Sequence, residues 1–157
     1  LSNSAGLLFV GLARFLDTLV AVGNGALDEA TEPSRTTIAV VENSCEAYAE
    51  ASLRLEALGA RLKVAIYPSK RTVAYYRLGG DSPPISAQTE SLVEKCLATR
   101  GIDYVNLSRA FAQMDDGPTD GFHYRVDGHW NPTGHRSGAR AMSRAFFPAS
   151  AGPGGRE

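Results

Sequence analysis

Residues 127–135 read Asp-Gly-His-Trp-Asn-Pro-Thr-Gly-His, and this run marks the start of a helix. Asn131 is a favoured N-cap residue, and Pro132 falls at the first helical position, where its missing N–H costs nothing. We therefore expect a helix from about Pro132 to Phe147, with His129 just ahead of its N-terminus. The positive end of the helix dipole disfavours an imidazolium at such a position, which suits His129 to accept a proton.

Asp127 stands two residues before His129, which is close enough to accept a hydrogen bond from Nδ1–H. That bond would fix the tautomer that leaves Nε2 free, the arrangement of base and orienting acid in Ser-His-Asp catalysis. We therefore predict that Asp127 and His129 are catalytic residues. The alternative is a purely structural Asp–His hydrogen bond in the loop that leads into the helix.

The rest of the chain alternates between helical and extended patterns. Short apolar runs at Leu62–Tyr67 and Ile102–Leu107 predict two strands. Helical spacing or capping residues predict further helices at Leu7–Val22, Ile38–Leu58, Arg71–Arg77 (a short helix or a turn), Ser86–Arg100 and Ser108–Met114, the last capped by Ser108. Helices that alternate with strands are typical of a parallel sheet covered by helices.

Residues 124–145 resemble the last motif of the SGNH (GDSL-type) hydrolase superfamily, which carries the Asp and His of its triad on one short loop before the final helix. The form Asp127-x-His129-Trp130 resembles the branch that includes the alginate O-acetyltransferase-like proteins. The resemblance extends more weakly back to Leu62. It implies an α/β fold, the C-terminal portion of a flavodoxin-like three-layer α/β/α domain with a parallel sheet, over residues 1–147, and we expect a disordered tail over 148–157.

The superfamily's nucleophile lies in a Gly-Asp-Ser motif that follows a strand. Gly80-Asp81-Ser82 has the same letters, but no strand is predicted before it and two prolines follow it, so it indicates a turn. We therefore expect the nucleophile and the oxyanion donors upstream of Leu1, in a longer protein. Two strands make a poor sheet, so we also expect the isolated chain to be marginally stable.

The resemblance implies a serine esterase that cleaves an acyl or acetyl ester of a small molecule or carbohydrate, without a cofactor. If a sugar hydroxyl replaces water, the same residues would carry out O-acetyl transfer to a carbohydrate. Sites in parallel α/β sheets lie beyond the carboxyl ends of the strands, so Lys70, Tyr124 and Trp130 are candidates for the substrate pocket. The simpler interpretations are a solvated loop charge for Lys70 and a core anchor for Trp130.

Two other classes of function remain open. Imidazole and carboxylate side chains at His123, Asp127, His129 and His135 could hold zinc or iron, although no metal site is our first prediction. The chain could also be a non-catalytic module that binds a carbohydrate or a partner, in which the Asp–His pair has no nucleophile.

Composition excludes some classes. The net charge of −1 gives no electrostatic basis for binding nucleic acid, and residues 7–22 are too short and too charged for a membrane span. Cys45 and Cys96 fall on two different predicted helices and are expected to be buried free thiols, with a disulfide as the alternative if the protein is exported. The sequence leaves the compartment open.

Overall fold

The computed structural model of the chain describes residues 32–114, 121–126 and 128–148. At its centre, β1 (Lys63–Ile66) and β2 (Asp103–Asn106) pair in parallel, with Lys63 opposite Asp103 and Ile66 opposite Asn106. Each strand is one residue shorter at either end than the apolar run that predicted it. The parallel pair among helices confirms the predicted α/β class.

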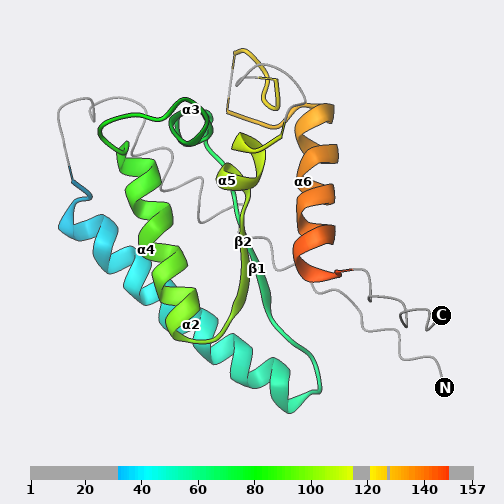
Figure 1. Ribbon diagram of the computed structural model, residues 1–157. Coiled ribbons are helices and arrows are strands. Elements are labelled where there is room, and N and C mark those ends of the chain that lie inside the picture. The colour runs from blue at the N-terminus through cyan, green and yellow to red at the C-terminus, as the bar shows by residue number, and fades with distance from the viewer. Residues whose placement is uncertain (1–31, 115–120, 127, 149–157) are drawn as a thin grey trace, which may run out of the picture.

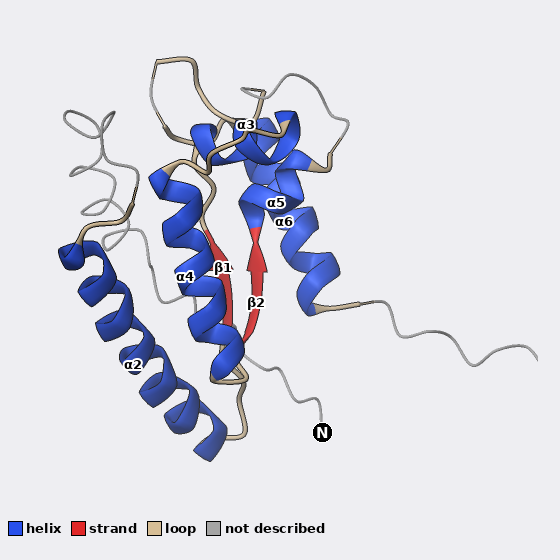
Figure 2. Cartoon of the chain, turned by 60° about the vertical axis from the view of Figure 1, so that its left-hand side comes forward, coloured by secondary structure: helices blue, strands red, loops and turns tan. Residues whose placement is uncertain are grey.

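Helices cover both faces of the two strands (Figures 1 and 2). α4 (Ile85–Thr99) packs on one face, and α2 (Arg35–Ala57) lies outside α4. α6 (Pro132–Phe146) packs on the other face, one residue shorter than predicted. The two short helices α3 (Lys70–Leu78) and α5 (Leu107–Ala112) follow the carboxyl ends of β1 and β2 and contact one another there.

Four of the predicted helix starts need correction, and α3 begins at Lys70, one residue before the predicted Arg71. α2 begins at Arg35 because the Ser34 side chain accepts a hydrogen bond from the Thr37 backbone N–H, three residues before the predicted start. α4 follows Pro84, so Ser86 lies inside the helix. α5 is capped by Asn106, not by Ser108.

The strands alternate between two apolar clusters because successive side chains point to opposite faces. Val64 and Ile66 pack with Leu97 of α4 and with Ile102. The other cluster contains residues from α3, α5, α6 and the segment before α6, and Ala65 packs against it; its buried members are Val73, Leu107, Phe111, Phe122 and Ala141. Trp130, which precedes α6, also packs against this second cluster.

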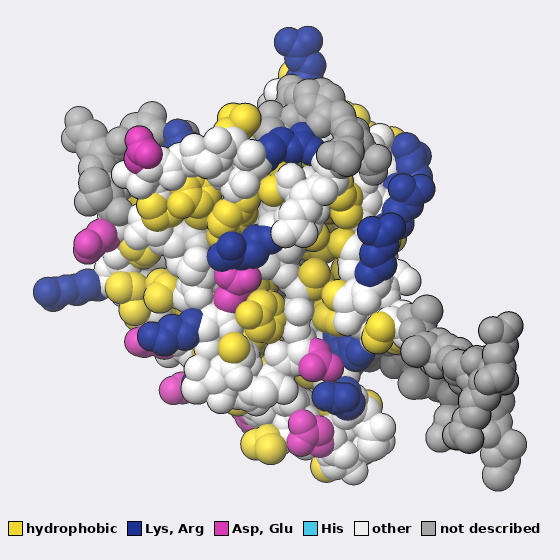
Figure 3. Space-filling view, in the orientation of Figure 1, with side chains coloured by type: hydrophobic (Ala, Val, Ile, Leu, Met, Phe, Trp, Pro, Cys, Tyr) yellow, Lys and Arg dark blue, Asp and Glu magenta, His cyan; other side chains and the backbone are white. Residues whose placement is uncertain are grey.

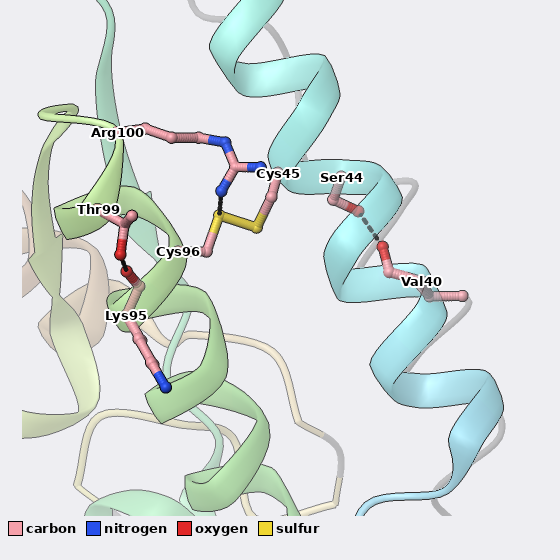
Figure 4. The surroundings of a disulfide bond; sticks show 7 residues. All are labelled: Val40, Ser44, Cys45, Lys95, Cys96, Thr99 and Arg100. Atoms are coloured by element: carbon pink, nitrogen blue, oxygen red, sulfur yellow. Dashed lines mark hydrogen bonds between the residues drawn. A yellow bond between two sulfur atoms is a disulfide. The ribbon is translucent and has the colours of Figure 1, made fainter.

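Cys45 of α2 and Cys96 of α4 form a disulfide, with their Cα atoms 6.1 Å apart (Figure 4). The prediction of two free thiols is therefore wrong, because residues far apart in the sequence meet where α2 packs on α4. Arg100, one turn after Cys96, donates a hydrogen bond from Nη1 to the Cys96 sulfur over 3.5 Å. The disulfide fastens the outermost helix to the rest of the fold.

The exposed face of α6 carries Arg136, Arg140 and Arg144, and basic side chains gather along this helix in Figure 3. In the described part of the chain, no helix has the length and apolar character needed to cross a membrane. The predicted helix at residues 7–22, the loop at 115–120, Asp127 and residues 149–157 of the predicted tail lie outside the described residues.

Candidate functional site

The segment that carries His129 folds back on itself ahead of α6. We call residues 121–126 and 128–131 the histidine arm. His123 and Trp130 form an antiparallel bridge, the Tyr124 N–H donates to the His129 carbonyl over 3.0 Å, and the Asn131 N–H donates to the Phe122 carbonyl over 3.0 Å. His129 is therefore held through its backbone, while the residue as a whole is exposed to solvent.

Asn131 joins the histidine arm to α6. Its side-chain oxygen accepts hydrogen bonds from the backbone N–H groups of Thr133 and Gly134, each over 2.9 Å, which confirms the predicted N-cap. Its side-chain amide donates to the carbonyls of Gly121 over 2.8 Å and His123 over 3.2 Å. One side chain thus orients both the helix and the loop on which His129 lies.

Lys70 and Tyr124, which were predicted to lie near His129, are brought together. The Lys70 ammonium donates a hydrogen bond to the Tyr124 backbone carbonyl, and the Tyr124 N–H is bonded to His129. Lys70 is half-buried at the first position of α3, so it belongs to a helix and not to the loop that the simpler interpretation assigned to it. The Tyr124 side chain is 48 % exposed and lies at the same end of the sheet.

Trp130 packs as an anchor for α6, as one of its two interpretations predicts. Its ring lies 5.5 Å from the ring of Phe111 and 5.4 Å from that of His135, measured between centroids. Gly138 leaves room for it, because a Cβ there would lie 2.7 Å from the indole Cζ3 atom. On β1's side, the ring of Tyr67 stacks on the indole at 4.7 Å. Sequence reasoning did not single out Tyr67.

His123 lies on the inner side of the arm and is only 2 % exposed. Its Nε2 atom is 3.4 Å from the Pro68 carbonyl oxygen, and its Nδ1 atom has no hydrogen-bond partner. Burial lowers the pKa of His123, as does the nearby Lys70 charge, while the contact with Pro68 opposes the shift. This histidine is therefore suited to remain neutral in the folded chain.

The structure separates the side chains of the proposed metal site. His123 is buried, whereas His129 and His135 are exposed. Among the residues described, no group of three or more His, Cys, Asp or Glu side chains is placed to hold a metal ion. Asp127, the fourth proposed ligand and the predicted partner of His129, lies outside the described residues.

The sequence did not single out a buried carboxyl group of α4 that lies next to the end of β2. Glu90 of α4 is 7 % exposed and accepts hydrogen bonds from Ser108 over 2.8 Å and Asn106 over 3.1 Å. Burial raises its pKa to about 7, against the opposing effect of hydrogen bonds from Ser108, Asn106 and Thr72. Ala87, Glu90 and Leu97 are all buried, and their helical spacing is the signal that identifies this position.

Gly80-Asp81-Ser82 lies where the sequence placed it, in a turn. It follows α3 rather than a strand, and Ser82 is exposed. The loop borders an open depression lined by Arg71, Ala74, Tyr75, Leu78, Gly79, Gly80, Ser82 and Pro84. None of the residues of the histidine arm lines this depression.

The comparison with protein families agrees with the sequence resemblance. The family model of the SGNH hydrolase-like domain of the acetyltransferase AlgX matches residues 27–154, which include β1, β2, all the described helices and the histidine arm. No curated protein and no solved structure matches the chain. The chain belongs to the family of SGNH hydrolase-like domains of the AlgX acetyltransferase type.

Proposed function

We propose that the protein transfers an acyl group, most simply acetyl, from an ester through a Ser-His-Asp triad to which this chain contributes Asp127 and His129. The family's description names an acetyltransferase, which supports acyl transfer. The acceptor we propose is a carbohydrate hydroxyl, as the sequence resemblance implies, or water, in which case the reaction is ester hydrolysis. Acyl or acetyl ester chemistry is what the family description suggests. The assignment of Asp127 and His129 to that chemistry is part of our proposal.

One observation carries the proposal. His129 is exposed on an arm whose backbone is fixed on both sides, by Tyr124 and by the N-cap Asn131. This arm lies beyond the carboxyl ends of two parallel strands, where α/β folds bind their substrates. A general base needs both features, since it must reach the substrate and must be held in one orientation.

In the proposed mechanism, Asp127 accepts a hydrogen bond from Nδ1–H of His129. Nε2 of His129 removes the proton from a serine hydroxyl, and the serine oxygen attacks the ester carbonyl. The tetrahedral intermediate collapses as His129 returns that proton to the leaving alcohol. His129 then removes a proton from the acceptor hydroxyl, whose oxygen takes the acyl group, and the serine is restored with this proton. We place the serine outside the described residues.

The test uses the full protein that contains this chain. We expect His129→Ala to lower turnover of an aryl acetate by about 10²- to 10⁴-fold, the usual contribution of a general base. Asp127→Asn should also lower it, since the amide cannot hold the same tautomer. Arg140→Gln is the control, because it changes an exposed side chain of α6 that makes no described contact with the histidine arm, and it should leave turnover unchanged.

A fluorophosphonate probe tests the nucleophile. It should label one serine in the wild-type protein and should label it much more slowly in His129→Ala. Equal labelling and equal turnover in the two proteins would refute the role of His129. A folded protein that neither reacts with the probe nor turns over esters, yet binds an oligosaccharide, would identify the binding module instead. Adding acetylated and unacetylated oligosaccharides to the assay separates transfer from hydrolysis.

A further inference from the structure

Three residues between the end of β1 and the start of α3, namely Tyr67, Pro68 and Lys70, contact the histidine arm. The Pro68 carbonyl faces His123, and the Lys70 ammonium donates to the Tyr124 carbonyl. Tyr67 contacts the arm further along, at Gly128 and Trp130. The hydrogen bonds among these contacts join residues that lie 54 to 61 positions apart in the chain.

Tyr67 is distinctive because it contacts both neighbours of His129. Its ring stacks on the Trp130 indole, with centroids 4.7 Å apart and planes inclined by 11°. Its hydroxyl donates a hydrogen bond to the Gly128 carbonyl over 3.4 Å. That carbonyl belongs to the peptide group that leads directly into His129. At 3.4 Å this bond is longer than the usual hydroxyl bond of about 2.7–2.8 Å, so the ring stack is the stronger of the two contacts.

The other contacts of Trp130 also border the indole, so the stack with Tyr67 adds to them. Phe111 of α5, together with His135 and Gly138 of α6, borders the indole. Tyr67 adds a ring face from the β1 side. An aromatic pair of this kind contributes about 0.5–1.5 kcal/mol beyond its buried area. Tyr67 remains 37 % exposed, so replacing it opens no large cavity in the core.

We propose that Tyr67 is a positioning residue for His129: by holding Gly128 and Trp130 together, it fixes the imidazole in the orientation needed for proton transfer. This proposal rests on the role of His129 proposed above. Tyr67 itself takes no part in the chemistry. A displacement of a catalytic group by about 1 Å can cost about 10²-fold in rate, so a residue that prevents such a displacement affects turnover more than substrate binding.

Fluorescence tests the geometry without any enzyme assay, because Trp130 is the only tryptophan of the chain. Far-UV circular dichroism first establishes that the 157-residue wild-type chain is folded. In the folded chain the emission of Trp130 should be altered in Tyr67→Leu and should match the wild type in Tyr67→Phe, which keeps the stack. Tyr75→Leu is the matched control. It removes one ring of another aromatic pair, Tyr75 and Tyr76, at the far end of α3 and should leave the emission unchanged. Thermal unfolding of each variant establishes that it is folded.

The imidazole of His129 supplies a second readout. Its Cε1–H signal in an NMR spectrum is identified by its loss in His129→Ala, and we expect it to move in Tyr67→Leu but not in Tyr75→Leu. In the full protein, Tyr67→Leu should lower kcat by about 10- to 100-fold with little change in KM. Tyr67→Phe should lower kcat by no more than about threefold, since only one long hydrogen bond is lost, and Tyr67→Trp should restore most of the rate.

The outcomes separate the two proposals. A folded Tyr67→Leu variant with wild-type emission, an unmoved His129 signal and an unchanged kcat would overturn the positioning role. An increase in KM alone would also overturn it, because it would place Tyr67 in substrate binding. If His129→Ala keeps full activity, the proposed function fails. The fluorescence and NMR results then still decide whether Tyr67 holds the arm.

Discussion

Ser108 of α5 donates a hydrogen bond to the carboxyl group of Glu90 on α4 over 2.8 Å, and both side chains are buried. Asn106, which caps α5, donates to the other oxygen of the same carboxyl group. The Thr72 hydroxyl of α3 is bonded to Ser86 of α4 over 2.8 Å. A polar network therefore joins three helices at the end of the sheet that carries the candidate site.

The network makes a prediction about pH. Burial raises the pKa of Glu90 from 4.5 to about 7, so the folded chain binds this proton more tightly than the unfolded chain does. The stabilisation is complete below pH 4.5 and decreases as the pH rises to about 7 and beyond. The full change is on the order of 3 kcal/mol. Glu90→Gln, which cannot ionise, should lose less stability than the wild type between pH 5 and pH 8.5.

Urea unfolding at both pH values measures this difference. Glu42→Gln, at an exposed position of α2, is the control and should follow the wild type. The Ser108 hydroxyl can turn to accept from the new amide, so the variant should fold. Parallel pH dependence of the wild type and Glu90→Gln would show that this carboxyl group does not titrate as expected.

His123 predicts the opposite dependence. Because burial lowers the pKa of His123, the unfolded chain binds this proton more tightly, and stability is lost as the pH falls below 6.5, the ordinary pKa of a histidine side chain. His123→Phe keeps a ring of similar size but cannot be protonated. The variant should therefore lose less stability than the wild type between pH 7 and pH 5, as followed by the melting temperature. Arg140→Gln, at an exposed position of α6, is the control and should behave like the wild type.

Three glycines, one in the histidine arm and two in α6, differ in the room that they leave for a side chain. At Gly134 a Cβ would lie 2.1 Å from the Phe122 backbone oxygen, which cannot give way without moving the arm. At Gly138 it would lie 2.7 Å from the Trp130 ring, and at Gly128 it would meet nothing within 4 Å. We expect alanine at Gly134 to cost most, alanine at Gly138 about 1–3 kcal/mol, and alanine at Gly128 little. Urea unfolding of the three variants checks this order, and a Gly138→Ala protein as stable as the wild type contradicts it.

The disulfide predicts a local effect. It closes a separation of 51 residues and should contribute about 2–4 kcal/mol, since a link of that span restricts the unfolded chain. Reduction should lower the melting temperature and accelerate hydrogen exchange in α2 more than in β1, β2 or α6, because α2 packs mainly on α4. The Cys45→Ser/Cys96→Ser variant should not respond to reductant. Uniform acceleration over all helices and strands would show that α2 is not a separate unit.

Local signals predicted the elements well. Asn131 and Pro132 located the start of α6, and the apolar runs located both strands to within one residue. The predicted cap of α5, Ser108, is wrong, because the helix begins two residues earlier, after Asn106 at the end of β2. Asn106 is the last residue of β2, and its side chain caps α5. Ser108 is buried instead, and its hydroxyl donates a hydrogen bond to Glu90. This burial depends on α4, which is distant in the sequence.

The site was predictable only in part for the same reason. The order of strands and loops placed Lys70 and Tyr124 at one end of the sheet, and the structure brings them into contact. No local pattern indicates that Tyr67 stacks on Trp130 or that Cys45 reaches Cys96, because each pair forms only when separate elements pack. The pairing of Asp127 with His129 stays a prediction.

The aromatic stack also constrains how this sequence can change over evolutionary time. Tyr67, Trp130 and Gly138 come from three separate parts of the gene. The flat ring at position 67 and the missing side chain at position 138 both suit the size of the indole at position 130. A smaller residue at position 130 would relax the requirement for glycine at 138 and for a flat ring at 67. A larger residue at position 138 would be tolerated only after position 130 had changed. These three positions should therefore vary together among relatives, in a preferred order of substitution.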